Sequence, residues 1–189
     1  MSELSPPPAA HPHLGGNIRF CVSCGSELVY RAWTEGDGSM QLCCDGPKCK
    51  HVHFLDPKVA AGVIPSIDGR AIILKRAYNP GKGLWTFPGG FVNRGEVVSE
   101  AAARETKEEA GVDVRMGPLL GVYSFPGNPT VLIVYAGEVT GGEPRALAES
   151  TELRLVGPDE IPFDDLAFDT TRAAFRDWRS WTGEKLLGA

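Results

Sequence analysis

Glutamates crowd one short stretch in the middle of this 189-residue sequence. We expect a helix over Val98–Ala110. Steps of three and four residues then place Glu105, Glu108 and Glu109 on one helix face. Like charges at this spacing each cost about 0.2–0.5 kcal/mol, and the last turn of a helix disfavours anions. Because Arg104 can neutralise only one carboxylate, the stretch predicts a helix that binds divalent cations through oxygen ligands.

The same stretch resembles the signature motif of the Nudix family. The residues that carry the resemblance are Gly90, Glu96, Arg104, Glu105, Glu108, Glu109, Gly111 and Val112. Thr106 departs from the family pattern, which usually has a larger aliphatic residue at that position. A solvated acidic helix face is the alternative explanation. Such faces normally interleave lysines and leave the last turn free of glutamate, so the resemblance is the better account.

The resemblance implies a hydrolase that cleaves a pyrophosphate bond with Mg²⁺ or Mn²⁺ as its cofactor. The cations would neutralise the diphosphate and help to form hydroxide from water. Arg104 would orient Glu108, and Glu105 is our preferred general base. The implied cation ligands are Glu105, Glu108 and Glu109, with Glu96 as a secondary metal or loop contact and Gly90 shaping the loop at the metal site.

The composition sets limits on the protein class. A chain that is 42% hydrophobic supports one ordinary core plus a small appendage. Its net charge of −5 argues against a surface for nucleic acid or an anionic membrane. We find neither an apolar run of the roughly 20 residues that span a bilayer nor a secretory signal. We therefore expect a cytoplasmic protein without a membrane or nucleic-acid partner.

All five cysteines fall between positions 21 and 49, which points to a local metal site. Their spacing is close to that of a zinc ribbon, although the second turn is longer than usual. Cys43 competes with Cys44 for the third ligand position, and we favour Cys44. Reduced thiols without metal are one alternative, and disulfides are less favoured without an export signal. The predicted ligands of a structural Zn²⁺ are Cys21, Cys24, Cys44 and Cys49.

These patterns predict three parts of the chain and an α/β fold. The parts are a disordered, proline-rich lead over residues 1–17, a zinc ribbon over 18–56 and a Nudix hydrolase domain over 57–189. For the last part, the resemblance implies an α/β/α sandwich around a mixed sheet. The expected elements after the ribbon are a hairpin of Val59–Ile64 and Ala71–Arg76, strands near 119–124, 130–140 and 152–156, and a covering helix over 170–187.

Substrate preference depends on segments outside the signature motif. A ribbon before the hydrolase domain resembles the Nudix subgroup of NADH, FAD and ADP-ribose pyrophosphatases. The segment 159–168 resembles the FAD and ADP-ribose branch. The Ser-Gln-Pro-Trp-Pro-Phe-Pro element of the NADH branch is absent, and Ser124–Gly127 stands at its place. We expect ADP-ribose or FAD as substrate, with NADH or NAD hydrolysis, or removal of NAD caps from RNA, as the alternative.

Several residues outside the motif are candidate substrate or metal contacts. Cations beside the loop could bind phosphates, aromatic rings could stack on an adenine, and acids after a Gly-Gly turn could add a metal ligand or base. Solvated cations, core aromatics and surface acids are the respective alternatives. The candidates are Arg76, Lys82, Trp85, Phe87, Glu149 and Glu152.

The expected partner is a small dinucleotide or nucleotide-sugar substrate. The resemblance also implies a homodimer. A nucleotide-sensing module without turnover is a further alternative, although such a module has no need of all four motif glutamates and the chain shows no basic DNA-reading helix.

Overall fold

The computed structural model describes residues 18–36 and 38–187. The lead predicted for residues 1–17 lies outside this range. The chain divides into two compact units, with the boundary between Asp56 and Pro57.

The small unit is a three-stranded antiparallel sheet in the order β1-β2-β3. Its strands are β1 (Leu28–Ala32), β2 (Met40–Cys44) and β3 (Val52–His53). Its buried centre consists of Cys21, Leu28 and Cys44, with Cys49 among the residues that pack against them. Two of the three central residues are cysteines, so this unit has almost no hydrocarbon core of its own.

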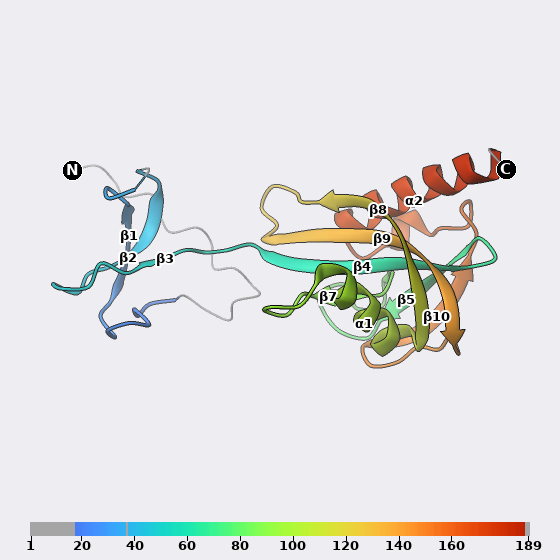
Figure 1. Cartoon of the computed structure of the whole chain (residues 1–189), viewed down its shortest axis with the longest axis horizontal. Coiled ribbons are helices and arrows are strands. Elements are labelled where there is room, and N and C mark those ends of the chain that lie inside the picture. Colours follow the sequence, from blue (N-terminus) through green and yellow to red (C-terminus); the bar gives the residue numbers. More distant parts are fainter. Residues whose placement is uncertain (1–17, 37, 188–189) are drawn as a thin grey trace. The chain divides into compact units, whose positions relative to one another are not determined.

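The large unit is built on a seven-stranded sheet with the main order β10-β5-β4-β9-β8 (Figure 1). Neighbouring β4 and β9 are parallel and the other pairs are antiparallel, so the sheet is mixed. The strands are β4 (Lys58–Ile67), β5 (Arg70–Arg76), β6 (Trp85–Thr86), β7 (Gly89–Phe91), β8 (Val112–Tyr123), β9 (Thr130–Gly142) and β10 (Ser150–Val156).

The predicted hairpin of β4 and β5 is paired only next to its turn. Asp68 and Gly69 form this turn with φ of 48° and 75°, as expected for an Asp-Gly hairpin. Beyond the turn the two strands separate, and two short strands pair with them instead. Trp85 of β6 lies opposite Lys75 of β5, and Gly90 of β7 lies opposite Ala61 of β4. This insertion brings the start of the signature motif onto the centre of the sheet.

A helix covers each face of the sheet: α1 (Val98–Ala110) and α2 (Asp169–Leu187), with a short 3-10 turn, η2 (Phe163–Asp165), before α2 (Figure 1). The side chains of β4 alternate between the two faces. Val63 packs in the cluster that contains Ala101 and Ala102 of α1, and Ile64 packs in the cluster that contains Phe175 of α2. The result is the three-layer α/β/α arrangement that the sequence predicts, and α1 has its predicted bounds.

The strand expected near 119–124 is longer than predicted and begins at Val112. Its first half alternates, with buried Val112 followed by exposed Asp113 and Arg115. The interruption at Gly117-Pro118 hid this continuity in the sequence. The structure tolerates Pro118 because β8 is an edge strand whose register with β9 is irregular between Met116 and Leu119. Within the described part of the chain, none of the helices is long and apolar enough to cross a membrane.

Candidate active site

Small side chains on one face of α1 bring the helix close to the sheet. Ala101, Ala102, Thr106 and Ala110 are buried. Thr106, which departs from the family pattern, donates its hydroxyl to the carbonyl of Ala102 at 2.8 Å, so its buried polar group is satisfied. The helix ends at Gly111, whose φ of 74° is the left-handed conformation that glycine accepts most easily. The acidic face is thereby held in a fixed position above the sheet.

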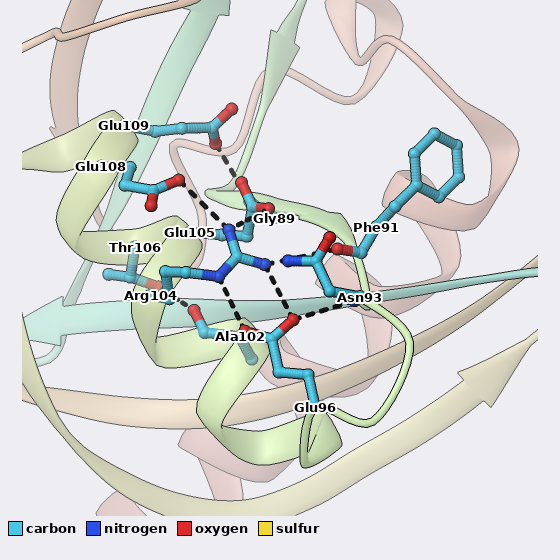
Figure 2. Close-up of polar contacts among 10 residues, drawn as sticks. All are labelled: Gly89, Phe91, Asn93, Glu96, Ala102, Arg104, Glu105, Thr106, Glu108 and Glu109. Atoms are coloured by element: carbon cyan, nitrogen blue, oxygen red, sulfur yellow. Dashed lines mark hydrogen bonds and ion pairs between the residues drawn. The ribbon is translucent and has the colours of Figure 1, made fainter.

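The guanidinium of Arg104 holds three carboxylates together (Figure 2). Its Nε and Nη2 donate to the two oxygens of Glu96 at 2.7 and 3.1 Å. Its Nη1 donates to Oε1 of Glu105 at 2.7 Å and to Oε2 of Glu108 at 3.2 Å. The sequence predicted the Glu108 contact, which proves to be the longest of these. Arg104 therefore fixes the positions of several carboxylates at once.

Glu96 fastens the loop before α1 to this network. Its Oε2 also accepts the backbone N–H of Asn93 at 2.9 Å. The hydrogen bonds from Arg104, assisted by this N–H, lower the pKa of Glu96 to about 2. The sequence left two roles open for Glu96, a secondary metal contact and a loop contact. Because both of its oxygens already accept hydrogen bonds, the geometry supports the loop contact.

Glu109 lies apart from Arg104 and is largely buried. Its Oε2 accepts the backbone N–H of Gly89 at 3.0 Å (Figure 2). Burial, with a smaller contribution from the negative charges of Glu105 and Glu149, raises the pKa of Glu109 to about 7. The Gly89 N–H and the Arg76 charge oppose this increase. A partly buried carboxylate close to two other negative charges is a site that gains from an added cation.

Gly90 lies against the Glu105 carboxyl group. A Cβ at this position would come within 2.5 Å of the Glu105 carboxyl carbon and of one of its oxygens. Any residue other than glycine would therefore displace that carboxylate. The cluster supplies carboxylate oxygens of differing exposure, already oriented by Arg104 and by the Gly89 N–H, and this donor set suits Mg²⁺ or Mn²⁺.

In the small unit, four cysteines form a second cluster. One ligand atom from each of Cys21, Cys24, Cys44 and Cys49 lies within 4.8 Å of all the others. The Sγ–Sγ distances are 3.8 Å for Cys21 and Cys49 and 3.4 Å for Cys24 and Cys44. Tetrahedral Zn²⁺ with Zn–S bonds of about 2.3 Å requires Sγ–Sγ distances of about 3.8 Å.

The strand geometry distinguishes Cys44 from its neighbour Cys43. Successive side chains of a strand point to opposite faces, so only one of the two can face the cluster. Cys44 does so, and its Sγ accepts the backbone N–H of Gly46 at 3.3 Å. Hydrogen bonds from Ser26 lower the pKa of Cys24 to about 6, which favours the thiolate that metals require. The four-cysteine group can hold a metal ion.

Comparison with known proteins identifies the family. A family model described as NUDIX domain matches residues 56–178, well over half of the chain. The chain belongs to the Nudix family. The Nudix hydrolase predicted from the sequence is thereby confirmed.

Two relatives show how far the similarity extends. A protein of Methanocaldococcus jannaschii named ADP-ribose pyrophosphatase is 38% identical over 136 residues, covering 70% of this Nudix chain and 79% of that protein. The NAD-capped RNA hydrolase NudC of Stutzerimonas stutzeri is 30% identical over 126 residues, covering 66% of this chain. The match spans only 42% of that NudC protein.

A solved structure extends the comparison to the fold. A NUDIX hydrolase from Nitrosomonas europaea superposes with a TM-score of 0.79 at 35% identity, covering 90% of this chain and 94% of that one. The large unit comprises 133 of the 189 residues, so this match continues into the small unit. The predicted Nudix α/β/α sandwich preceded by a small module is confirmed.

The structure brings two of the accessory residues to the Nudix site. Arg76 and Glu149 both act electrostatically on Glu109. Arg76 is held at the end of β5, where its Nε donates to the carbonyl of Pro80 at 2.8 Å and its guanidinium lies 5.2 Å from the centre of the Phe168 ring. This placement is compatible with the predicted phosphate contact for Arg76 and with the predicted metal or base role for Glu149.

Other accessory candidates lie elsewhere. Trp85 and Phe87 are 4% and 3% exposed and belong to the core under α2. A core position was the alternative to adenine stacking for these two residues. Their burial leaves no ring face open to an adenine. Glu152 is bound to Lys75 and Arg154 at 3.4 and 2.6 Å. Both cations also lie over the Trp85 ring, on the face of the sheet opposite α1, so Glu152 is not part of the Nudix site. Lys82 is exposed in the loop, and its predicted phosphate contact stays a prediction.

Sequence reasoning missed the backbone contribution to the Nudix site. The N–H groups of Gly89 and Asn93 orient Glu109 and Glu96, and in both interactions the donor is a backbone group that no side-chain pattern reveals. The one available signal was the Gly89-Gly90 pair, which indicates a close backbone approach. A Cβ on Gly89 would lie 2.9 Å from the carbonyl oxygen of Ala61, so glycine is needed to bring this amide to Glu109.

Replacing Arg104 by Lys should show how much the network contributes. An ammonium group cannot span three carboxylates in fixed directions as a guanidinium does. We expect Arg104→Lys to lower kcat by about 10- to 100-fold, the effect of losing the hydrogen-bonded support of metal ligands. Arg179→Lys is a matched control on α2, because Arg179 makes one exposed ion pair with Asp159. Equal kcat values for the wild type and Arg104→Lys would contradict the positioning role.

Proposed function

We propose that this protein hydrolyses the pyrophosphate bond of a nucleoside diphosphate linked to another moiety, with Mg²⁺ or Mn²⁺ held by Glu105, Glu108 and Glu109. The observation that carries the proposal is the environment of Glu109. This carboxylate is partly buried, fixed by the Gly89 N–H and placed beside other acids, an arrangement that an added cation would stabilise. The family membership and the name of the Methanocaldococcus jannaschii relative support the same reaction class.

Bound divalent cations would neutralise the diphosphate oxygens and make the attacking water more acidic. The protein's own residues supply the rest of the chemistry. Arg104 fixes Glu105 through Oε1, and within the described part of the chain no hydrogen bond is formed by Oε2 of Glu105. This oxygen is our candidate to accept the proton from the water. The water oxygen bonds to one phosphorus, the bridging P–O bond breaks, and the two products are phosphate monoesters.

We assign ADP-ribose or FAD as the preferred substrate class. The sequence-based preference for this branch agrees with the name of the Methanocaldococcus jannaschii relative, of which this chain covers 79%. NADH or NAD hydrolysis, including removal of NAD caps from RNA, is the second candidate because a NudC protein is 30% identical. The net charge of −5 does not favour RNA, since RNA binding depends on cationic surfaces.

A sensing role without turnover is less well supported. The chain keeps all four motif glutamates, and Arg104 and the Gly89 N–H hold each of them in place. For the small unit we propose structural Zn²⁺ on Cys21, Cys24, Cys44 and Cys49. The homodimer implied by the family resemblance stays a prediction for sedimentation analysis.

A substrate panel tests the proposed function. Purified protein is assayed with Mg²⁺ or Mn²⁺ on ADP-ribose, FAD, NADH and an NAD-capped RNA oligonucleotide, with products separated by chromatography. We expect the highest kcat/KM on ADP-ribose or FAD, AMP among the products, and complete loss of turnover with excess EDTA. In ¹⁸O-labelled water, one product phosphate should carry the label. Turnover that survives EDTA, or no turnover on any member of the panel, would refute the proposal.

A further inference from the structure

The loop 143–149, between β9 and β10, closes against the last turn of α1. The carbonyl groups at the end of a helix have no partner within the helix. Two of them are bound here by loop amides: Leu147 donates to the carbonyl of Glu109 at 2.9 Å, and Arg145 donates to that of Ala110 at 3.0 Å. The loop thus holds the backbone of the residue whose carboxylate is central to the site.

The same loop is fixed to the sheet at its other end. Ala77, which follows β5, donates its N–H to the carbonyl of Glu149 at 2.7 Å. Ser150 then lies opposite Arg76 in the β10–β5 pair. The loop therefore links the end of α1 to the end of β5, where Arg76 is located. The charges of Glu149 and Arg76 both affect the pKa of Glu109, which supports this proximity.

Ala148 gives the loop its shape through an unusual backbone conformation. Its φ is 46°, in the left-handed region that alanine rarely adopts. The turn around it is closed by the Ser150 N–H, which donates to the carbonyl of Leu147 at 3.0 Å. Within the described residues, the only other non-glycine residue with positive φ is Asp68, in the β4–β5 turn. Asp68 precedes Gly69 in a turn that requires this conformation, whereas no such turn sequence accounts for Ala148.

Glu109 is consequently held from two sides. The Gly89 N–H binds its carboxylate, and the Leu147 N–H binds its backbone carbonyl. If the turn at Ala148 straightened, Leu147 would move away from the end of α1. The Glu109 carbonyl would then lose its loop donor, and Glu109 would be held in place by the Gly89 N–H alone, so its carboxylate would be less well positioned.

We propose that Ala148 is a positioning residue for the metal site: its left-handed turn keeps the loop 143–149 bound to the end of α1 and so places the Glu109 carboxylate for the divalent cations. This inference rests on the proposed function, because it assigns Glu109 as a cation ligand. Ala148 itself is exposed, and its methyl side chain offers no ligand atom to a cation.

The test compares three variants by calorimetric titration with Mn²⁺ in the absence of substrate. Valine strongly disfavours positive φ, whereas glycine accepts it. Because Ala148 is exposed, Ala148→Val changes the backbone preference without crowding a core. We expect Ala148→Val to raise the Kd for Mn²⁺ about tenfold, the scale found when the support of a metal ligand is lost. Ala148→Gly should stay within about twofold of the wild type.

Asp68→Val is the matched control. Asp68 has nearly the same φ, 48°, and is also exposed, but it lies at the far end of β4 from Gly89 and Gly90. The Asp68→Val variant should lower the thermal midpoint, as Ala148→Val does, but its Kd for Mn²⁺ should stay within about twofold of the wild type. This control separates a general loss of stability from a specific effect on the metal site.

The outcomes are separable. An unchanged Kd in Ala148→Val, or an equal increase in Asp68→Val, would overturn the positioning role. Should Ala148→Val fail to fold, Ala148→Leu, which is unbranched at Cβ, decides the question, and an unchanged Kd in that variant overturns the role. If wild-type protein binds no Mn²⁺, or if Glu109→Gln binds it as tightly as the wild type, the proposed function itself fails.

Discussion

Glu109→Gln is expected to reduce hydrolysis by about a thousandfold, a loss of about 4 kcal/mol in transition-state stabilisation. Glutamine has the shape of glutamate, and its carbonyl oxygen can still accept the Gly89 N–H. The substitution therefore removes the negative charge while keeping the hydrogen bond. Because the charge is what would bind a cation beside the diphosphate, turnover should fall and the Mg²⁺ concentration for half-maximal activity should rise.

The stability of the metal-free protein provides an independent measurement for the same variant. The pKa of Glu109 rises from 4.5 to about 7 on folding. A raised carboxyl pKa favours the folded state below pH 4.5, and that contribution is lost as the pH rises to 7. The difference corresponds to about 3 kcal/mol. In EDTA, wild-type stability should therefore fall between pH 5 and 8 by more than that of Glu109→Gln, which has no such group.

In EDTA at pH 8 we expect Glu109→Gln to be more stable than the wild type, and adding Mg²⁺ should make the wild type the more stable of the two. A cation that binds only the folded state stabilises it, so the thermal midpoint of the wild type should rise while that of Glu109→Gln stays nearly constant. Glu100→Gln is a suitable control, because Glu100 is an exposed acid in the first turn of the same helix. If Glu100→Gln lost as much activity as Glu109→Gln, the loss would reflect the total charge of the helix and not a defined ligand.

Local sequence rules predicted α1 and its acidic face because those rules act within one helix. The helix extends from Val98 to Ala110, and Gly111 takes the left-handed conformation expected after its end. The spacing of three and four residues is a property of the helix itself, so no tertiary information was needed to place the glutamates together. The turn at Asp68-Gly69 was predictable for the same reason.

Contacts between distant segments were not predictable in this way. The Gly89 amide reaches Glu109 only because β7 pairs with β4 between the separated strands of the hairpin. Similarly, Trp85 is buried because β6 pairs with β5 under α2, whereas its sequence position favoured the core but also allowed a ring that stacks on an adenine. Glu152 followed a plausible turn, but its strand register directs it to the other face of the sheet. Register and strand order decide these positions, and neither follows from local pattern.

For the small unit, replacing either of two adjacent cysteines by alanine should have opposite results. We expect Cys44→Ala to unfold this unit and Cys43→Ala to leave it folded. Structural Zn²⁺ contributes about 10–16 kcal/mol of apparent binding free energy, which is as large as the whole stability of a typical domain. The centre of this unit is Cys21, Leu28 and Cys44, so its small hydrocarbon core would not compensate for the loss of a bound metal.

The measurement is the zinc content of the purified chain together with limited proteolysis. Wild type and Cys43→Ala should each hold about one zinc per chain and resist cleavage between residues 18 and 56, because four thiolates complete one tetrahedral site. Cys44→Ala should lose most of its zinc and be cleaved there. Since Cys43 and Cys44 are both buried and adjacent, a general effect of cysteine removal would affect the two variants alike. Zinc retained in Cys44→Ala but lost in Cys43→Ala would mean that β2 presents the other face to the metal, and the ligand set would have to be reassigned.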